Sequence, residues 1–243
     1  MTEIATLLAS YPRARPPLPA AAARIYVEEY KVNRGVNARG LYRVIVWLES
    51  WMHRRVAFSA AGSTLLEIGA GTVNHRRFEE RASVYDIVEP LPALYAGSPE
   101  IARIDHIYAS IDDVPVAPRY DRIFSVAVLE HVEHLPALVA ACALRLADGG
   151  VFQAGIPAEG GMVWGLAWRM TTGVSYRLRT GLPYAPVMRH EHVNTAVEII
   201  AILRHLFDDV MISWFPLPVR HFAFYAYIEA RRPKFDNCAP AVR

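Results

Sequence analysis

Short apolar runs recur along residues 64–156, separated by stretches with helical spacing. The first run, around Leu65, Leu66 and Ile68, is unbroken rather than alternating, as expected of a strand that is covered on both faces. Strands that alternate with helices predict an α/β fold with a doubly wound, mostly parallel sheet, whose ligand binds at the carboxyl ends of the strands. The further predicted strands are Val84–Val88, Ile104–Ala109, Arg122–Val128 and Val151–Ile156.

Helices are predicted between and after these strands. We expect a short helix over His75–Arg81 and a longer one over Leu135–Ala147. Thr195 and Glu198 have the spacing of a capping box, which predicts a helix that begins there and continues through Leu206.

The end of the chain breaks the parallel rhythm. Val210–Phe215 and Phe222–Glu229 follow one another too closely for a parallel crossover, so they predict an antiparallel pair that completes a seven-stranded sheet. The sheet domain would span residues 61–232. Residues 158–193 exceed a plain connection, and long insertions are usually functional. The tail, residues 233–243, is expected to fray.

Residues 1–60 precede the sheet and divide into two parts. A cluster of prolines favours a loose or polyproline-like arm over residues 1–22. Residues 23–60 have helical spacing and are expected to form an N-terminal helical cap, divided near Gly35 and Gly40. The cap either packs on the main domain or closes over a substrate with the side chains of Tyr26, Tyr30, Asn33 and Arg34.

Composition narrows the class of protein. The 243 residues are 53% hydrophobic, which supports one α/β domain with a sizeable core. A net charge of +2 gives no overall field that attracts nucleic acid or an anionic membrane, although a local patch is compatible with it. Two cysteines argue against a disulfide framework or a cysteine zinc site, and neither a signal pattern nor a long apolar segment is present. We therefore expect a cytoplasmic protein without a membrane span.

The first predicted strand opens directly into Gly69-Ala70-Gly71. Glycine reaches positive φ without strain and lets a ligand approach the backbone. Glu89 ends the second strand, 20 positions after Gly69, where nucleotide-binding α/β units place an acid that accepts hydrogen bonds from ribose hydroxyls. The pair predicts a site for a nucleotide-like cofactor, and the alternative for Glu89 is a solvent-facing strand end.

The order of motifs resembles the class I S-adenosylmethionine-dependent methyltransferases over residues 63–231, in their small-molecule branch. The closing antiparallel pair distinguishes these enzymes from dehydrogenases, whose last fingerprint glycine would fall at Asn74. The motifs that carry the resemblance are Leu65-Leu66-Glu67-Ile68-Gly69-Ala70-Gly71, the acid Glu89, Tyr120-Asp121-Arg122-Ile123-Phe124-Ser125, and Ala127-Val128-Leu129-Glu130-His131-Val132.

The resemblance implies S-adenosylmethionine as the cofactor. By this comparison Glu67 and the Gly69–Gly71 backbone hold the methionine end, Glu89 binds the ribose hydroxyls, and Ser110 and Ile111 recognise adenine. Two positions depart from the family pattern: Ser110 replaces a frequent Asp, and Val73 replaces the third glycine. The full set of implied cofactor residues is Glu67, Gly69, Ala70, Gly71, Glu89, Ser110, Ile111 and Ala127.

Methyl transfer requires an aligned acceptor and, for a hydroxyl acceptor, a base. The candidates are His131 and His134, after the fourth strand, and the insertion residues His190, Glu191 and His192. Of these, His131 and the three insertion residues are the predicted catalytic residues. In an extended segment, alternation would point the two insertion histidines one way and Glu191 the other, as a base with a partner or as metal ligands. The alternatives are a loop-packing role for His131 and a surface loop for the cluster.

A metal-assisted O-methyltransferase is a further alternative. Some relatives carry Glu-x-x-Glu-His after the fourth strand; Glu130-His131 matches the end of that motif, but Ala127 replaces its first Glu. A hard ion such as Mg²⁺ would need Glu191 or another oxygen ligand in its place. We expect no metal.

The sequence thus predicts methyl transfer to a small-molecule or glycan- or lipid-linked acceptor, at oxygen because of the histidines. Nucleic acid is a weak candidate at this charge balance. A cofactor-binding or scaffold protein without catalysis is the alternative, and the oligomeric state is open. The aromatic and basic residues of the insertion either recognise the acceptor or divide into core aromatics and solvated arginines. They are Trp164, Trp168, Tyr176, Tyr184, Arg169, Arg177, Arg179 and Arg189.

Overall fold

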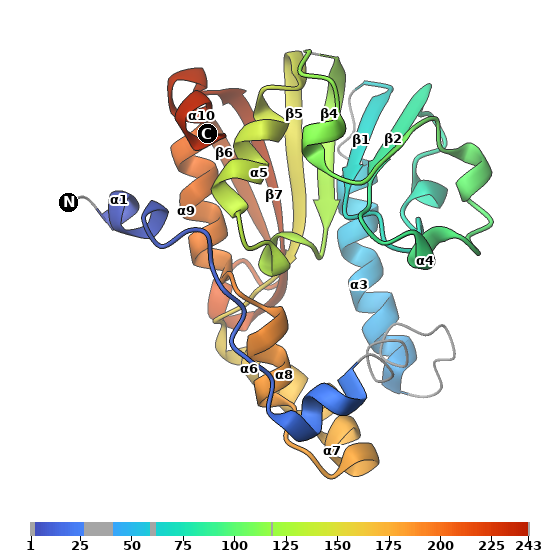
Figure 1. The fold of residues 1–243 in the computed structure, drawn as a ribbon, viewed down its shortest axis with the longest axis vertical. Helices are drawn as coiled ribbons and strands as arrows, with labels where there is room; N and C mark the ends of the chain where they lie inside the picture. The colour runs from blue at the N-terminus through green and yellow to red at the C-terminus, as the bar shows by residue number, and fades with distance from the viewer. Residues whose placement is uncertain (1–2, 27–40, 59–61, 118, 243) are drawn as a thin grey trace.

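The structure, a computed structural model, describes residues 3–26, 41–58, 62–117 and 119–242, without the side chains of residues 41–47 and 49. A seven-stranded sheet has the order β3-β2-β1-β4-β5-β7-β6 (Figure 1). Strands β1 to β5 are parallel to one another, and β7 is antiparallel to its two neighbours, β5 and β6. The predicted mostly parallel sheet is therefore confirmed. Its strands are β1 (Thr64–Ile68), β2 (Val84–Val88), β3 (Ile107–Tyr108), β4 (Tyr120–Val126), β5 (Leu146–Pro157), β6 (Phe207–Pro216) and β7 (Ala223–Pro233).

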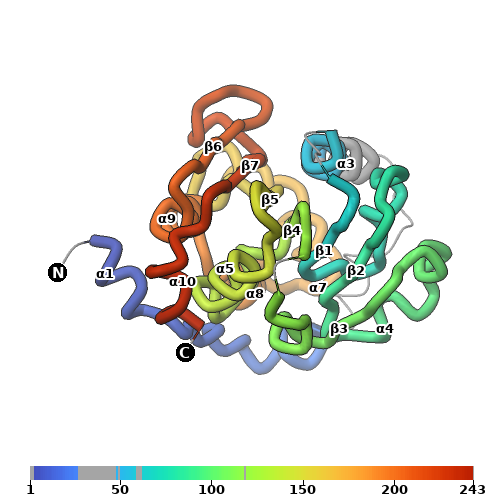
Figure 2. The backbone as a smooth tube through the Cα atoms, turned by 90° about the horizontal axis from the view of Figure 1, so that it is seen from above, coloured from blue at the N-terminus to red at the C-terminus, as the bar shows by residue number. Residues whose placement is uncertain are grey.

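Helices cover both faces of the sheet. Helices α5 (Leu135–Ala143), α9 (Ala196–Leu206) and α10 (Phe235–Ala241) lie on one face, and α3 (Leu41–Phe58) lies on the other (Figure 2). None of the helices within the described ranges is both long and apolar enough to cross a membrane. Other α-helices are α1 (Glu3–Leu8), α4 (Pro92–Tyr95), α6 (Met162–Trp168), α7 (Val174–Thr180) and α8 (Ala185–Glu191).

Alternate strand residues supply two different cores. Leu66 and Ile68 of β1 pack on the face of α5 and α9, while Leu65 packs with Phe124 and with Val56 of α3 on the opposite face. Each fully buried side chain of this kind contributes roughly 1.5–3 kcal/mol. The α3 face also buries polar residues, namely Glu67, Arg122, Gln153 and Glu229.

Two predicted elements near the sheet edge are shorter than expected. The third strand contains only Ile107 and Tyr108, which pair with Ile87 and Val88 of β2. The predicted helix over residues 75–81 is likewise only a 3₁₀ turn, Arg76–Phe78. A single turn is enough here because β2 begins six residues later.

The helix predicted over residues 135–147 ends at Ala143, and β5 begins earlier than expected, at Leu146. Leu146 pairs with Tyr120 across a register shift, so Gly149 and Gly150, which follow the predicted helix in the sequence, lie within the strand. The expected frayed tail is also different. Residues Phe235–Ala241 form α10, and Cys238 on this helix is fully buried against the main core.

The proline-rich arm is tied down rather than loose. It contains α1, residues 20–26 are helical, and Ala22 packs against Tyr176 and Tyr184 of the insertion. The predicted division of the cap at Gly35 and Gly40 lies outside the described residues, as do Tyr30, Asn33 and Arg34. The insertion itself forms α6, a π-helical turn, α7 and α8, which project beyond the end of the sheet (Figure 1).

Candidate functional site

The turn after β1 contains two glycines with positive φ, 69° at Gly69 and 54° at Gly71. A Cβ on Gly69 would lie 2.6 Å from Cγ2 of Val128, so close packing requires glycine there. A Cβ on Gly71 would meet no atom within 4 Å. The backbone at Gly71 therefore faces open space, as a site for a closely approaching ligand requires.

Val73 stands where the family pattern has its third glycine. It keeps a positive φ of 61° and is fully buried. A β-branched residue rarely adopts this conformation, which costs of the order of 1–3 kcal/mol when it does. The burial of Val73 with Phe124 and Ala70 stabilises the turn in the glycine-like shape.

Glu89, at the end of β2, is joined to the glycine turn. Its Oε2 accepts a hydrogen bond from the N–H of Gly71 at 2.8 Å, and its Oε1 accepts from the N–H of Leu91 at 3.0 Å. The residue is only 5% exposed, so the alternative of a solvent-facing strand end is wrong. Each carboxylate oxygen keeps a second lone-pair site, which can accept from a hydroxyl.

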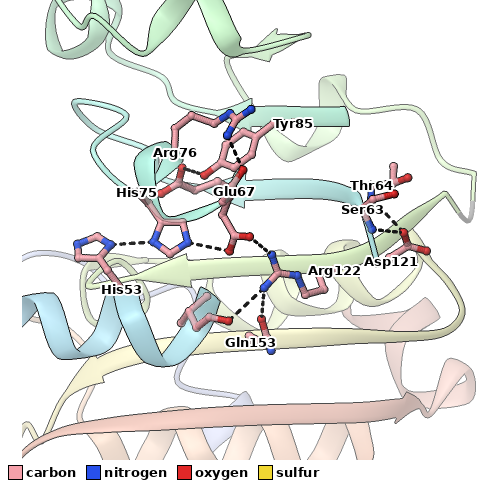
Figure 3. Close-up of polar contacts among 12 residues, drawn as sticks. His53, Ser63, Thr64, Glu67, His75, Arg76, Tyr85, Asp121, Arg122 and Gln153 are labelled. Carbon is pink, nitrogen blue, oxygen red and sulfur yellow. Dashed lines mark hydrogen bonds and ion pairs between the residues drawn. The ribbon is translucent and has the colours of Figure 1, made fainter. Parts of the chain in front are cut away.

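Glu67 of β1 is a buried acid on the α3 face of the sheet. Its Oε2 accepts a hydrogen bond from the hydroxyl of Tyr85 at 2.7 Å (Figure 3). Burial raises the pKa of Glu67 to about 8, although the hydrogen bond from Tyr85 opposes this shift. The carboxyl is therefore mostly neutral near pH 7, and an ammonium group brought beside it would favour its ionisation.

The predicted adenine residues follow β3. Ser110 caps the 3₁₀ turn Ile111–Asp113: its Oγ accepts from the N–H of Asp112 at 3.2 Å, and its own N–H bonds to Oδ2 of Asp113 at 2.9 Å. The Ser110 hydroxyl still retains its hydrogen as a donor. Ala127 directly follows β4 and has a φ of 55°. The predicted cofactor residues therefore lie at or near the carboxyl ends of β1, β2, β3 and β4.

Two of the four predicted catalytic residues meet at this edge of the sheet. The rings of His131 and His192 are T-shaped, with centroids 4.7 Å apart. Nδ1 of His131 donates to the carbonyl oxygen of Glu191 at 2.8 Å, since a carbonyl can only accept. Nδ1 of His192 is 3.0 Å from Oε2 of Glu159, which also accepts from Nε1 of Trp164 at 2.5 Å.

His190 and Glu191 lie elsewhere, which corrects the prediction for an extended segment. Helix α8 continues through Glu191, so the side chains do not alternate. Nδ1 of His190 bonds to the carbonyl oxygen of Pro16 at 2.7 Å, and Oε1 of Glu191 accepts from the hydroxyl of Tyr26 at 3.1 Å. His190 thus holds the N-terminal arm, and Glu191 holds the start of the cap that follows it.

Backbone bonds to η4, the 3₁₀ turn Leu129–His131, position His192. The N–H groups of Val193 and Asn194 both donate to the carbonyl oxygen of Glu130, at 2.8 and 3.1 Å. The side-chain amide of Asn194 donates to the carbonyl oxygens of Leu129 and Val132. The residues after α8 are therefore fastened beside His131.

The pKa of His192 is raised above its ordinary value. Burial disfavours the charged imidazole, but the hydrogen bond to Glu159 and the nearby carboxylates of Glu130 and Glu159 outweigh it. Sequence reasoning missed Glu159. The available signal was its place two residues beyond the end of β5, at the same edge as the other site residues.

Metal binding was a further alternative for these residues. In the described part of the chain, no three His, Cys, Asp or Glu side chains form a group that could hold a metal ion.

Comparison of the sequence with family models finds no match, and comparison with curated proteins finds none either. Solved structures do match. A possible histamine N-methyltransferase from Thermotoga maritima is 15% identical, with a TM-score of 0.55 over 85% of this chain and 98% of that one. The chain has the fold of the class I S-adenosylmethionine-dependent methyltransferases.

Two further structures share this methyltransferase fold and hold S-adenosylhomocysteine. The magnesium protoporphyrin IX methyltransferase of Synechocystis PCC 6803 is 13% identical, with a TM-score of 0.52 over 87% of this chain and 96% of that one. The plantazolicin methyltransferase BpumL is 12% identical, with a TM-score of 0.54 over 95% of this chain and 96% of that one. At these identities the likeness confirms the predicted fold.

Proposed function

We propose that this protein transfers the methyl group of S-adenosylmethionine to an oxygen atom of a small-molecule, glycan-like or lipid-linked acceptor. One observation carries the proposal: on a methyltransferase fold, the strand-end acid Glu89 is bonded to the N–H of Gly71, whose backbone faces open space. This geometry suits a cofactor that places its ribose at the acid and its methionine end along the glycine turn.

The cofactor residues would be those implied by the family resemblance. When bound, S-adenosylmethionine supplies a methyl group on a sulfonium with an excellent leaving group. Glu67 suits the ammonium of the methionine end because it is a buried carboxyl with a raised pKa, which pairing with a cation would lower. Glu89 would accept from the ribose hydroxyls, and Ser110 and Ile111 would meet adenine.

His192 would act as the base. Its Nδ1–H stays on the Glu159 carboxylate, so Nε2 is left to take the proton of an acceptor hydroxyl, and Glu159 stabilises the imidazolium that forms. His131 packs edge-on against this ring and fixes its orientation. Such a base contributes about 10²–10⁴-fold, and alignment of the acceptor contributes about 7–11 kcal/mol.

Calorimetry and transfer of a labelled methyl group test the proposal. We expect the protein to bind S-adenosylmethionine and to label an oxygen of a small molecule in a cell extract. Glu89→Ala should lose both activities because it removes the acceptor for the ribose and the bond to Gly71. The matched control is Glu80→Ala, at an exposed position, which should keep both.

Three outcomes would contradict parts of this proposal. Folded protein that does not bind at millimolar cofactor would exclude the cofactor assignment. Binding without any labelled product would favour the alternative of a cofactor-binding protein without catalysis. A methyl group located by mass spectrometry on nitrogen or carbon would exclude oxygen as the target.

A further inference from the structure

An exposed apolar stripe runs along residues 162–180. Helix α6, the π turn Arg169–Gly173 and α7 follow one another without a break. In an α-helix, residues four positions apart are separated by slightly more than one turn, so a row of them rotates gradually around the helix axis. A π turn contains more residues per turn and rotates the row back. Every fourth residue of this segment can therefore lie on the same side. The stripe consists of Met162, Leu166, Met170, Val174 and Leu178, which are 49–82% exposed.

The other side of this segment already has its own partners. Tyr176 is buried with Tyr184 and with Ala22 of the arm in a small separate core. Trp164 lies two positions from both Met162 and Leu166, on the opposite side of α6, where it bonds to Glu159. The stripe is thus not needed to hold these helices together, and in the described part of the chain it remains open to solvent.

Positive charge accompanies the stripe. No acidic residue occurs between Glu159 and Glu191, whereas four exposed arginines do. The chain's net charge is +2 and this segment supplies +4, which leaves −2 for the remainder. Helices α6, α7 and α8 lie at one end of the molecule, beyond the sheet (Figure 1). The four arginines are Arg169, Arg177, Arg179 and Arg189.

We propose that this helical segment docks the protein on the surface of an anionic lipid bilayer. The apolar stripe would lie at the boundary of the acyl chains, and the arginines would lie among the negatively charged headgroups. A second copy of this chain is a poorer partner, because it would bring two sets of four arginines together without an acidic residue between them. Trp164 shares α6 with the stripe and bonds to Glu159, the partner of the proposed base His192. Docking would therefore place the proposed site of methyl transfer near the bilayer. The proposal does not depend on methyl transfer.

Vesicle flotation tests this docking. The full chain is mixed with vesicles of phosphatidylcholine alone or of equal parts phosphatidylcholine and phosphatidylserine. We expect binding to the anionic vesicles only, weakened by salt. Met170→Gln combined with Leu178→Gln should reduce it about tenfold or more because less apolar surface is buried. Arg177→Gln should reduce it about fivefold.

Matched controls are exposed residues on other faces. Met211→Gln, on β6, and Arg204→Gln, on α9, should bind vesicles as the original chain does. The proposal would be overturned if the chain bound neither kind of vesicle. It would also be overturned if the control variants lost as much binding as the stripe variants. Light scattering that shows a dimer which Met170→Gln with Leu178→Gln converts to a monomer would overturn it too. Unchanged calorimetric cofactor binding in the stripe variants would show that the candidate site is intact.

Discussion

At the scale of single residues, Glu159 should control the basicity of His192. Glu159→Gln keeps an oxygen that accepts from both His192 and Trp164 but removes the negative charge. The pKa of His192 should therefore fall, and the acidic limb of the kcat profile should move to lower pH. His192→Gln should lower kcat by about 10²–10⁴-fold while leaving cofactor affinity unchanged.

His190→Gln is the matched control for these variants. His190 bonds to Pro16 of the arm, so its replacement should leave the pH of the acidic limb unchanged. If His192→Gln reduced cofactor binding and kcat equally, its role would be structural rather than that of a base.

The sequence predicts the positions of residues in short motifs beside strands, but not of residues whose contacts join distant parts of the chain. Gly69, Gly71 and Glu89 belong to motifs next to predicted strands, so their meeting at one edge follows from the topology. The pairing of His192 with Glu159 spans 33 positions and depends on how the insertion folds. The prediction of alternating side chains in an extended segment at His190–His192 was wrong, because α8 has a proline in its first turn and continues as a helix through Glu191.

At the scale of elements, the turn after β1 offers a test of whether Gly71 is needed for its backbone conformation alone or also for contact with a ligand. Gly71 and Gly149 both have positive φ, and a Cβ on either would meet nothing within 4 Å. Each substitution by alanine should therefore cost about 1–2 kcal/mol of folding stability. Only Gly71→Ala places a methyl group where the cofactor is proposed to approach.

Urea unfolding and cofactor calorimetry on the two variants check this prediction. We expect similar losses of stability and, for Gly71→Ala alone, a loss of cofactor affinity of about tenfold or more, as expected for about 1.4 kcal/mol of lost contact. Equal affinities in Gly71→Ala and Gly149→Ala would mean that the cofactor does not lie against this turn.

Elements with strong local signals were predicted well. The capping box of Thr195 and Glu198 is present and opens α9, which ends at Leu206 as expected. The short third strand and the tail were predicted less well, because their structure depends on distant partners. The tail helix α10 is held by bonds such as that from the side-chain amide of Asn237 to the carbonyl oxygen of His205.

At the scale of the whole molecule, a chain of buried polar contacts joins α3 to the sheet (Figure 3). Nδ1 of His53 on α3 lies 2.8 Å from Nδ1 of His75, whose Nε2 lies 3.2 Å from Glu79. Glu79 in turn forms a 2.6 Å ion pair with the fully buried Arg122. Removing one partner of such a pair is strongly destabilising, because the other charge is left buried alone. No hydrophobic pattern could have predicted this network, since its members come from separate elements of the chain.

Two buried groups on the α3 face of the sheet, His53 of this network and Glu67 outside it, should give stability a lower and an upper pH limit. Burial and the nearby His75 lower the pKa of His53 to about 3, so unfolding takes up a proton and stability is lost as pH falls below the unfolded value near 6.5. Glu67 has a folded pKa of about 8, so its contribution is present below about 4.5 and is lost as pH rises towards 8. Each group contributes at most about 1.4 kcal/mol per pH unit.

Urea unfolding at a series of pH values isolates the two contributions. His53→Asn keeps a side chain that can bond to His75 but does not titrate, so its stability should approach that of the original chain as pH falls from about 6.5 to 4. Glu67→Gln keeps the bond to Tyr85, and its stability should approach that of the original chain as pH rises from about 5 to 8. Stability differences that stay constant with pH would mean that neither group has the folded pKa that its burial imposes. If the stability difference from the original chain instead changes with pH in opposite directions in the two variants, both pH limits of stability arise from groups between α3 and the sheet. This layer lies beside the turn that is proposed to hold the cofactor.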